Sequence, residues 1–395
     1  MSDRDFALHP LMRPGGTQNT KVTNEELFFD LVYVFLVTQI SHGLLHHLTW
    51  LGAAQTSVLW FAAWLGWQYT GWVTNWFNPR VPALRGLLFG TMALALLCGA
   101  AVPEAFGPRG LAFALAYCFM QTGRSAFIVA SLPADHPLAP NYRRILGWNI
   151  IASIFWIAGG LTTPAGRLPL WAAGVACEYV SPMFGFRLPG LGRSRTSDWT
   201  ISGRHLVERC QLFVIVALGE TIMASGLSLA ESTEWSSSEL GGFAVSFLCT
   251  IAMWWLYFET SSEEAEHAIA ASSDPGRMGA YIHYLHVVLI GGIIVTAVAM
   301  DILLEDPMIP ARGAPTLVLT LGPAIYLLGS LVYRWVATRR LAKIQLGGII
   351  VLALVGIMGQ DLVLWKLAFC ETFVFLAVSF VSSRKPVALP ASPGH

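Results

Sequence analysis

Long apolar stretches follow one another along almost the whole chain, and they constrain its fold more than any other feature. A run of about 18 or more apolar residues predicts a transmembrane helix, because such a helix must cross about 30 Å of hydrocarbon. Prolines, glycines and charged clusters divide these runs into predicted spans at 26–49, 53–76, 84–104, 109–132, 144–163, 168–186, 205–230, 240–260, 280–304, 315–337, 342–358 and 361–382. We therefore expect an all-α integral membrane protein with about 12 transmembrane helices, located in the cell membrane.

The composition agrees with a molecular surface that faces lipid. Of the 395 residues, 55% are hydrophobic and 12% are charged, whereas an ordinary soluble domain has about 25% charged residues. The formal net charge is zero, so nothing in the overall charge marks the chain as a nucleic-acid binder. The lipid bilayer is the expected partner, and nucleic acid is not.

The basic residues of the loops predict the orientation of the chain. The loops expected outside hold only Arg109, Arg167 and Arg312, while the alternate loops and both termini hold most of the other arginines and lysines. Cytoplasmic loops carry the excess of basic residues, so both termini are expected in the cytoplasm. The expected organisation is a cytoplasmic tail (1–25), a first six-helix half (26–186), a cytoplasmic linker (187–204), a second six-helix half (205–382) and a cytoplasmic tail (383–395).

The two halves share sequence features that suggest a duplication. A Leu-Trp pair followed by a Cys-Glu pair occurs in the sixth span, ending at Glu178, and in the twelfth, ending at Glu371. A tyrosine precedes Arg124 in the fourth span, and another precedes Arg334 in the tenth. Six spans are an even number, so we expect a parallel pseudo-repeat with an axis along the membrane normal.

Glu178 and Glu371 are the first candidate site residues. Each lies about ten residues into its span and therefore near the middle of the bilayer, at about 1.5 Å of rise per residue. Ionisable side chains at this depth are costly and tend to be functional. They could line an ion or solute pathway, or they could pair with other groups and only lock the bundle.

Two further spans begin with candidate residues. Glu26 and Asp30 are four residues apart and so share one face of the first helix. The seventh span has Glu208 and Arg209 near its start and Glu220 about three turns deeper. Glu220 is too deep to reach the interface, so it must pair, take a proton or bind a cation.

Few basic residues are available inside the spans. Arg124 is a credible counter-ion, but the buried acids outnumber the bases, so some acids are expected to be protonated or cation-bound. His283 and His286 lie on one helix face, where hydrogen-bonded histidines are the commoner arrangement and a metal pair the rarer one. No metal site is predicted.

Signatures of soluble enzymes are absent from the sequence. It has no Walker A, GxSxG or HExxH motif, and its six cysteines lie in apolar segments without metal-ligand spacing. We therefore predict no catalytic residue and no cofactor.

Two runs carry a family resemblance. The first covers 26–35 and reads ELFFDLVYVF, and the second begins at Glu208-Arg209 and ends at Ile222. Both resemble the bacterial low temperature requirement A (LtrA) family, as do the Tyr-His start of the ninth span and the run 324–329. Asn24 departs from the pattern, because a tryptophan that would anchor the first helix at the membrane interface often stands there. The resemblance covers essentially the whole chain and implies an integral bacterial membrane protein. It marks five residues as important for the family: Glu26, Asp30, Glu208, Arg209 and Glu220. It does not imply a particular biochemical activity.

The leading interpretation is a transporter or channel for protons, cations or a small solute. It predicts that six acids line one interior: Glu26, Asp30, Glu178, Glu208, Glu220 and Glu371. One alternative is an intramembrane enzyme acting on a lipid or hydrophobic metabolite, with Asp30, Glu208 and a histidine as acid-base groups. Another is a structural or regulatory membrane protein for growth in the cold. The sequence indicates neither the solute nor the oligomeric state.

Overall fold

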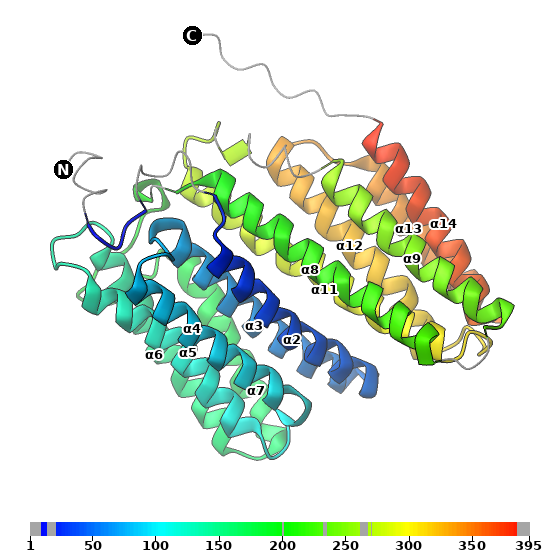
Figure 1. Ribbon diagram of the computed structural model, residues 1–395, viewed down its shortest axis with the longest axis horizontal. Coiled ribbons are helices and arrows are strands. Elements are labelled where there is room, and N and C mark those ends of the chain that lie inside the picture. The colour runs from blue at the N-terminus through cyan, green and yellow to red at the C-terminus, as the bar shows by residue number, and fades with distance from the viewer. Residues whose placement is uncertain are drawn as a thin grey trace, which may run out of the picture. The chain divides into compact units, whose positions relative to one another are not determined.

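The described part of the computed structural model, residues 9–13, 21–199, 201–231, 235–260, 268–269 and 271–384, is all helical (Figure 1). It contains no β-strand beyond isolated bridges. Its α-helices are α2 (Asn24–His46), α3 (Trp50–Trp76), α4 (Pro82–Ala101), α5 (Gly110–Ser131), α6 (Ala139–Leu161), α7 (Pro164–Met183), α8 (Gly203–Glu231), α9 (Ser237–Phe258), α11 (Pro275–Glu305), α12 (Ala314–Thr338), α13 (Lys343–Met358) and α14 (Leu364–Ser383).

Each predicted span coincides with one of these helices, and the expectation of an all-α fold is confirmed. The largest differences are at the starts of α6 and α11, which begin at Ala139 and Pro275 rather than at 144 and 280. Nine helices of the described residues are long and apolar enough to cross a membrane. The three that fall short are α3, α5 and α7.

The chain forms two compact units. The N-terminal unit comprises residues 1–209 and 273–277, and the C-terminal unit comprises 210–272 and 278–395. Within the N-terminal unit, α4, α5 and α6 lie side by side, α6 packs on α7, and α2 packs on α3 and α4 (Figure 1). Nearly every residue of α3 from Val58 to Trp76 is buried, so α3 is the best enclosed helix of this unit.

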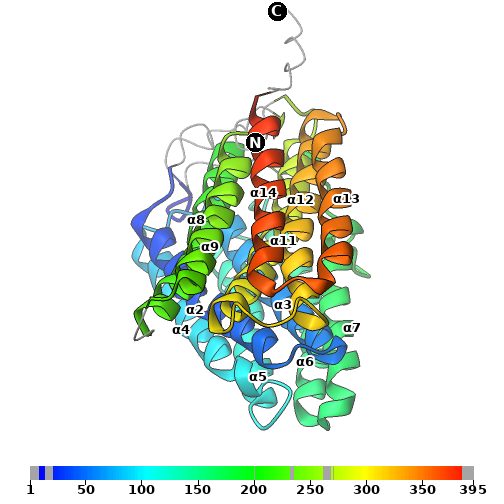
Figure 2. The same cartoon turned by 90° about the vertical axis from the view of Figure 1, so that its right-hand side faces the viewer.

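Within the C-terminal unit, α12, α13 and α14 lie side by side and α9 packs on α14 (Figure 2). Glycines allow α11 and α12 to approach closely. A Cβ atom added at Gly292 would lie 2.5 Å from the backbone nitrogen of Tyr326, and one added at Gly322 would lie 2.7 Å from that of Thr296. Close packing at small residues is typical of helices in membranes.

Large apolar side chains on the helix surfaces are exposed. They include Leu31, Phe119, Ile154 and Phe373, each more than 60% exposed. A soluble protein rarely shows such a surface, whereas lipid contact accounts for it.

Candidate functional site

Glu26 lies in the first turn of α2 and helps to begin that helix. Its Oε2 accepts hydrogen bonds from the backbone nitrogen of Thr23 at 2.9 Å and from the Thr23 hydroxyl at 3.1 Å. A threonine followed three residues later by glutamate is a common helix start, and the N-terminal end of a helix favours a negative charge. The local sequence therefore fixes the position of this carboxylate, which is 1% exposed.

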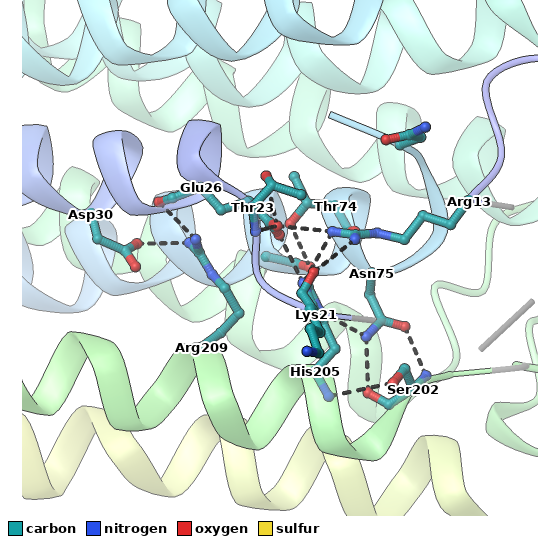
Figure 3. Close-up of polar contacts among 12 residues, drawn as sticks. Arg13, Lys21, Thr23, Glu26, Asp30, Thr74, Asn75, Ser202, His205 and Arg209 are labelled. Atoms are coloured by element: carbon teal, nitrogen blue, oxygen red, sulfur yellow. Dashed lines mark hydrogen bonds and ion pairs between the residues drawn. The ribbon is translucent and has the colours of Figure 1, made fainter. Parts of the chain in front are cut away.

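Two basic side chains from distant segments reach the Glu26 carboxylate (Figure 3). Arg13 Nη2 donates to Oε2 at 2.9 Å, and His205 Nε2 lies 2.8 Å from Oε1. Arg13 also donates to the carbonyl oxygens of Thr74 and Lys21. Burial lowers the pKa of Arg13, and the Glu26 carboxylate opposes this change by stabilising the charged guanidinium.

The protonation state of His205 follows from the hydrogen bonds of Asn75. The Asn75 Oδ1 accepts from the backbone nitrogen of Ser202 at 3.0 Å, so the Asn75 Nδ2 group faces His205 Nδ1 at 3.1 Å. Nδ2 can only donate, and His205 Nδ1 must therefore accept. The ring carries its proton on Nε2 and donates it to Glu26, so His205 is neutral. Arg13 Nη2 and His205 Nε2 lie 3.1 Å apart. They are not bonded to each other, because both atoms are donors to the Glu26 carboxylate.

Asp30 lies one turn deeper and pairs with Arg209 of α8. Arg209 Nη2 donates to Asp30 Oδ1 at 2.7 Å, and its Nη1 donates to the Glu26 carbonyl oxygen at 2.8 Å. Trp67 Nε1 donates to the same Asp30 oxygen at 2.7 Å, and its ring lies under the Arg209 guanidinium. Two carboxylates, two guanidinium groups and a neutral imidazole make this buried cluster electrically neutral, which limits the cost of burying its charges.

A second polar cluster of the N-terminal unit surrounds Glu178 of α7. Its carboxylate accepts hydrogen bonds from the Tyr117 hydroxyl at 3.0 Å, from Gln121 Nε2 at 3.3 Å and from Trp156 Nε1 at 3.3 Å. Three donors stabilise an ionised carboxylate. Glu178, which was predicted from the sequence, therefore lies in surroundings that can hold its negative charge.

Arg124 joins this cluster without touching Glu178. Its Nη2 donates to Gln121 Oε1 at 2.5 Å, which places the amide dipole of Gln121 between the guanidinium and the carboxylate. Arg124 Nη1 donates to Gly66 and Thr70 of α3. Helix α3 thus contacts both clusters, since Trp67 faces Asp30 while Gly66 and Thr70 face Arg124.

Glu371 of α14 has a different environment in the C-terminal unit. It is 1% exposed, and its Oε1 accepts one hydrogen bond, from the Thr320 hydroxyl at 2.6 Å. In the part of the chain that the structure describes, Oε2 has no hydrogen-bond partner and no basic side chain forms an ion pair with Glu371.

Glu220 also lies in the C-terminal unit and is 8% exposed. It acts electrostatically on Asp301 of α11, a half-buried acid that the sequence interpretation passed over. The neighbouring Thr221 hydroxyl lies 2.8 Å from that of Thr250. Glu208 is half-buried and belongs to none of these hydrogen-bonded clusters among the described residues.

The described residues contain no group of three or more His, Cys, Asp or Glu side chains that could hold a metal ion, around the histidines of α11 or elsewhere. His286 Nδ1 lies 2.7 Å from the Ile282 carbonyl oxygen, so it donates there, and Nε2 accepts from the Tyr257 hydroxyl at 2.8 Å. Both ring nitrogens of His286 are thus satisfied. His283 is fully buried beside it on the same helix.

Several members of these clusters were not predicted from the sequence. Arg13 lies in the expected cytoplasmic tail (1–25), and Asn75, Gln121 and Thr320 are not among the predicted site residues. Asn75 has a signal in the sequence, because it lies with Gln68, Thr70 and Thr74 at one end of an otherwise apolar helix.

Comparisons with known proteins place the chain in a family. The family model described as "Bacterial low temperature requirement A protein (LtrA)" matches residues 21–381. The "Uncharacterized protein RA0937" of Rhizobium meliloti (strain 1021) is 36% identical over 346 residues, which is 86% of this chain and 83% of that protein. No solved structure matches the chain. The resemblance drawn from the sequence motifs is confirmed, and the chain belongs to the bacterial low temperature requirement A (LtrA) family.

Proposed function

We propose that the protein is a multi-pass membrane transporter that moves protons, and that Glu371 is the group that binds them. The observation that carries this proposal is the isolation of the Glu371 carboxyl. It is fully buried, it accepts one hydrogen bond from a hydroxyl, and its second oxygen has no partner among the described residues.

Three acids of the N-terminal unit provide the contrast. Glu26 and Asp30 have arginine partners, and Glu178 has three donors and the Gln121 link to Arg124. An ionised carboxylate without such compensation is costly in an apolar environment. Glu371 is therefore stable in its neutral, protonated form. Release of its proton is the unfavourable step of transport and must be driven by another step.

The ligands around Glu371 favour a proton over a metal cation. A cation such as Ca²⁺ takes about 6–8 oxygen ligands. Among the described residues, the hydrogen bond at this site joins Glu371 to the Thr320 hydroxyl, and Glu371 Oε2 has no hydrogen-bond partner. Gly356 borders the site, since a Cβ added there would lie 3.3 Å from Glu371 Oε1, and so no further side chain enters from that position.

All twelve α-helices are proposed to cross the membrane, with both termini in the cytoplasm and the halves as a parallel repeat. Similar helix pairings within each unit support the repeat. Helices α5, α6 and α7 pack in series in the first, as α12, α13 and α14 do in the second. The second and sixth helices of each half also pack together, as α3 with α7 and as α9 with α14.

Proton flux into proteoliposomes tests the function. The full-length protein is reconstituted with an internal pH-sensitive dye, and a membrane potential is imposed. We expect flux with the native protein and loss of at least nine-tenths of it with Glu371→Gln, which keeps the shape but cannot exchange a proton.

The matched control is Asp361→Asn, because Asp361 is exposed and pairs with Arg312 at the surface. It should retain the native flux. Native flux from a folded Glu371→Gln protein, or no flux from the native protein under any imposed gradient, would contradict the proposal.

A further inference from the structure

A short segment before α2, residues 9–13, lies across the C-terminal end of α3. The backbone nitrogen of Arg13 donates to the Trp76 carbonyl oxygen at 3.1 Å, and that of Asn78 donates to the Leu11 carbonyl oxygen at 2.8 Å. Met12 stands opposite Phe77 in an isolated antiparallel bridge. We call residues 9–13 the strap.

The strap delivers one side chain to the cluster around Glu26 (Figure 3). Arg13 is 9% exposed and donates to Glu26 Oε2 and to the Thr74 carbonyl oxygen. The other basic members, His205 and Arg209, stand on α8. Arg13 is therefore the basic group of this cluster that can leave without a helix moving.

Within the described residues, the strap is attached through two backbone hydrogen bonds to the end of α3, the buried side chain of Met12, the hydrogen bonds of Arg13, and an edge-on contact of His9 with His136 at 5.7 Å. Segments with few buried contacts open locally while the rest of a protein stays folded.

Departure of Arg13 would change the charge of the cluster. The groups that face Glu26 are Arg13 from the strap, His205 and Arg209 from α8, and Asp30 one turn along α2. Arg80 also acts electrostatically on Arg13. With Arg13 in place the cluster is neutral. Without it, two carboxylates face a single guanidinium and a neutral histidine, and one negative charge is uncompensated.

We infer that residues 9–13 form a displaceable strap, and that its departure converts the neutral cluster around Glu26 and His205 into a site that takes up a proton. This inference rests on the proposed proton transport for its physiological role. Strap opening itself is an independent property of the N-terminal unit.

The first test measures strap opening without transport. Met12→Cys is treated with a charged, water-soluble maleimide in the folded full-length protein, and native protein gives the background from its own cysteines. The matched control is Phe29→Cys, because Phe29 is also buried but lies on α2. We expect Met12→Cys to react at least tenfold faster. Equal reaction rates of the two variants would show that the strap does not open, whatever the flux assay shows.

The second test locks the strap. Met12 and Phe77 form a non-hydrogen-bonded pair, for which Cα atoms are about 4.5 Å apart, within the range of about 4.4–6.8 Å that a disulfide spans. Oxidised Met12→Cys/Phe77→Cys protein should lose most of its proton flux and regain it on reduction. Unchanged flux in the oxidised protein would overturn the role of the strap in transport.

A third variant covers the case in which the double-cysteine protein does not fold. Arg13→Ala removes the guanidinium group and vacates the space beside Glu26. Added guanidinium ion at low concentration should bind in this space and raise the thermal unfolding temperature. The same addition should not stabilise Arg13→Ala/Glu26→Gln. Equal responses of the two variants would overturn the assignment of this site.

Discussion

At the scale of single residues, the buried acids differ in what compensates their charge. Glu26 and Asp30 contact guanidinium groups, Glu178 accepts three hydrogen bonds, and Glu371 accepts one. The same residue type in the same Cys-Glu context thus meets opposite environments in the two halves. Local sequence cannot reveal this difference, because the deciding partners lie on other helices.

This difference predicts unequal costs for the same substitution. Glu178→Gln should destabilise the protein by about 2–4 kcal/mol, because it replaces a carboxylate that accepts several donors and leaves Arg124 without its compensating charge. Glu371→Gln should cost less than about 1 kcal/mol, because a neutral acid and an amide differ little in desolvation cost. Denaturant unfolding in detergent measures both values, and equal costs would show that Glu371 is also ionised.

His136 predicts a dependence of stability on pH at the strap. Burial and the nearby His9 lower its pKa, and Asp135 acts in the opposite direction. Below the usual pKa of about 6.5, the unfolded chain binds a proton that the folded chain does not. The contribution of His136 to folding stability is therefore complete above that pH. It is lost as the pH falls toward the lowered pKa of His136 in the folded protein.

The unfolding temperature of native protein should thus fall between pH 7.5 and 5.5 more than that of His136→Gln. His46→Gln serves as the control, because His46 is exposed at the end of α2. A native protein and a His136→Gln variant with parallel pH profiles would refute this contribution.

At the scale of helices, the sequence predicted the elements because apolar length is a local property. Each of the twelve predicted spans became one helix, although α6 and α11 begin a full turn earlier than expected. The early starts contain Pro140 and Pro275, and proline is well tolerated in the first turn of a helix.

The seam between α11 and α12 predicts a sensitive glycine. A Cβ at Gly322 would lie 2.7 Å from the backbone nitrogen of Thr296, which cannot move without the helix. Gly322→Ala should therefore destabilise the protein by about 1–3 kcal/mol, as overpacking does elsewhere. Gly347→Ala on α13 is the matched control, because a Cβ there meets nothing within 4 Å. Unfolding in detergent should separate the two, and equal stability would mean that the helices move apart at no cost.

At the scale of the whole molecule, candidate residues could be predicted from the sequence, but their grouping in space could not. Glu26, Asp30 and Arg209 were predicted, and the structure brings them together. Arg13 and Asn75 were missed, because Asn75 meets His205 across 130 positions of the chain and Arg13 precedes the first span. Pairings of this kind depend on which helix faces meet, and apolar length carries no information about that.

Helices α3, α5 and α7 are expected to cross the membrane, although they are less apolar than the other nine helices. They are 27, 22 and 20 residues long, enough to cross about 30 Å at 1.5 Å per residue. They fall short of the apolar threshold because their polar residues, such as Asn75, Arg124 and Glu178, face partners inside the N-terminal unit. A polar side chain whose partners are inside the protein does not prevent a helix from crossing.

Pairs of single-cysteine variants at the two ends of each of these helices test whether it crosses. The chosen positions are exposed or lie in the adjoining connections: His47 and Arg80 for α3, Arg109 and Asp135 for α5, and Thr163 and Arg193 for α7. An impermeant maleimide applied to intact cells should label the first position of each pair and reach the second only after permeabilisation. The loop arginines determine the side of the membrane on which each position is expected. Labelling of both positions of a pair from outside would show that its helix does not cross. It would also contradict the parallel relation between the halves.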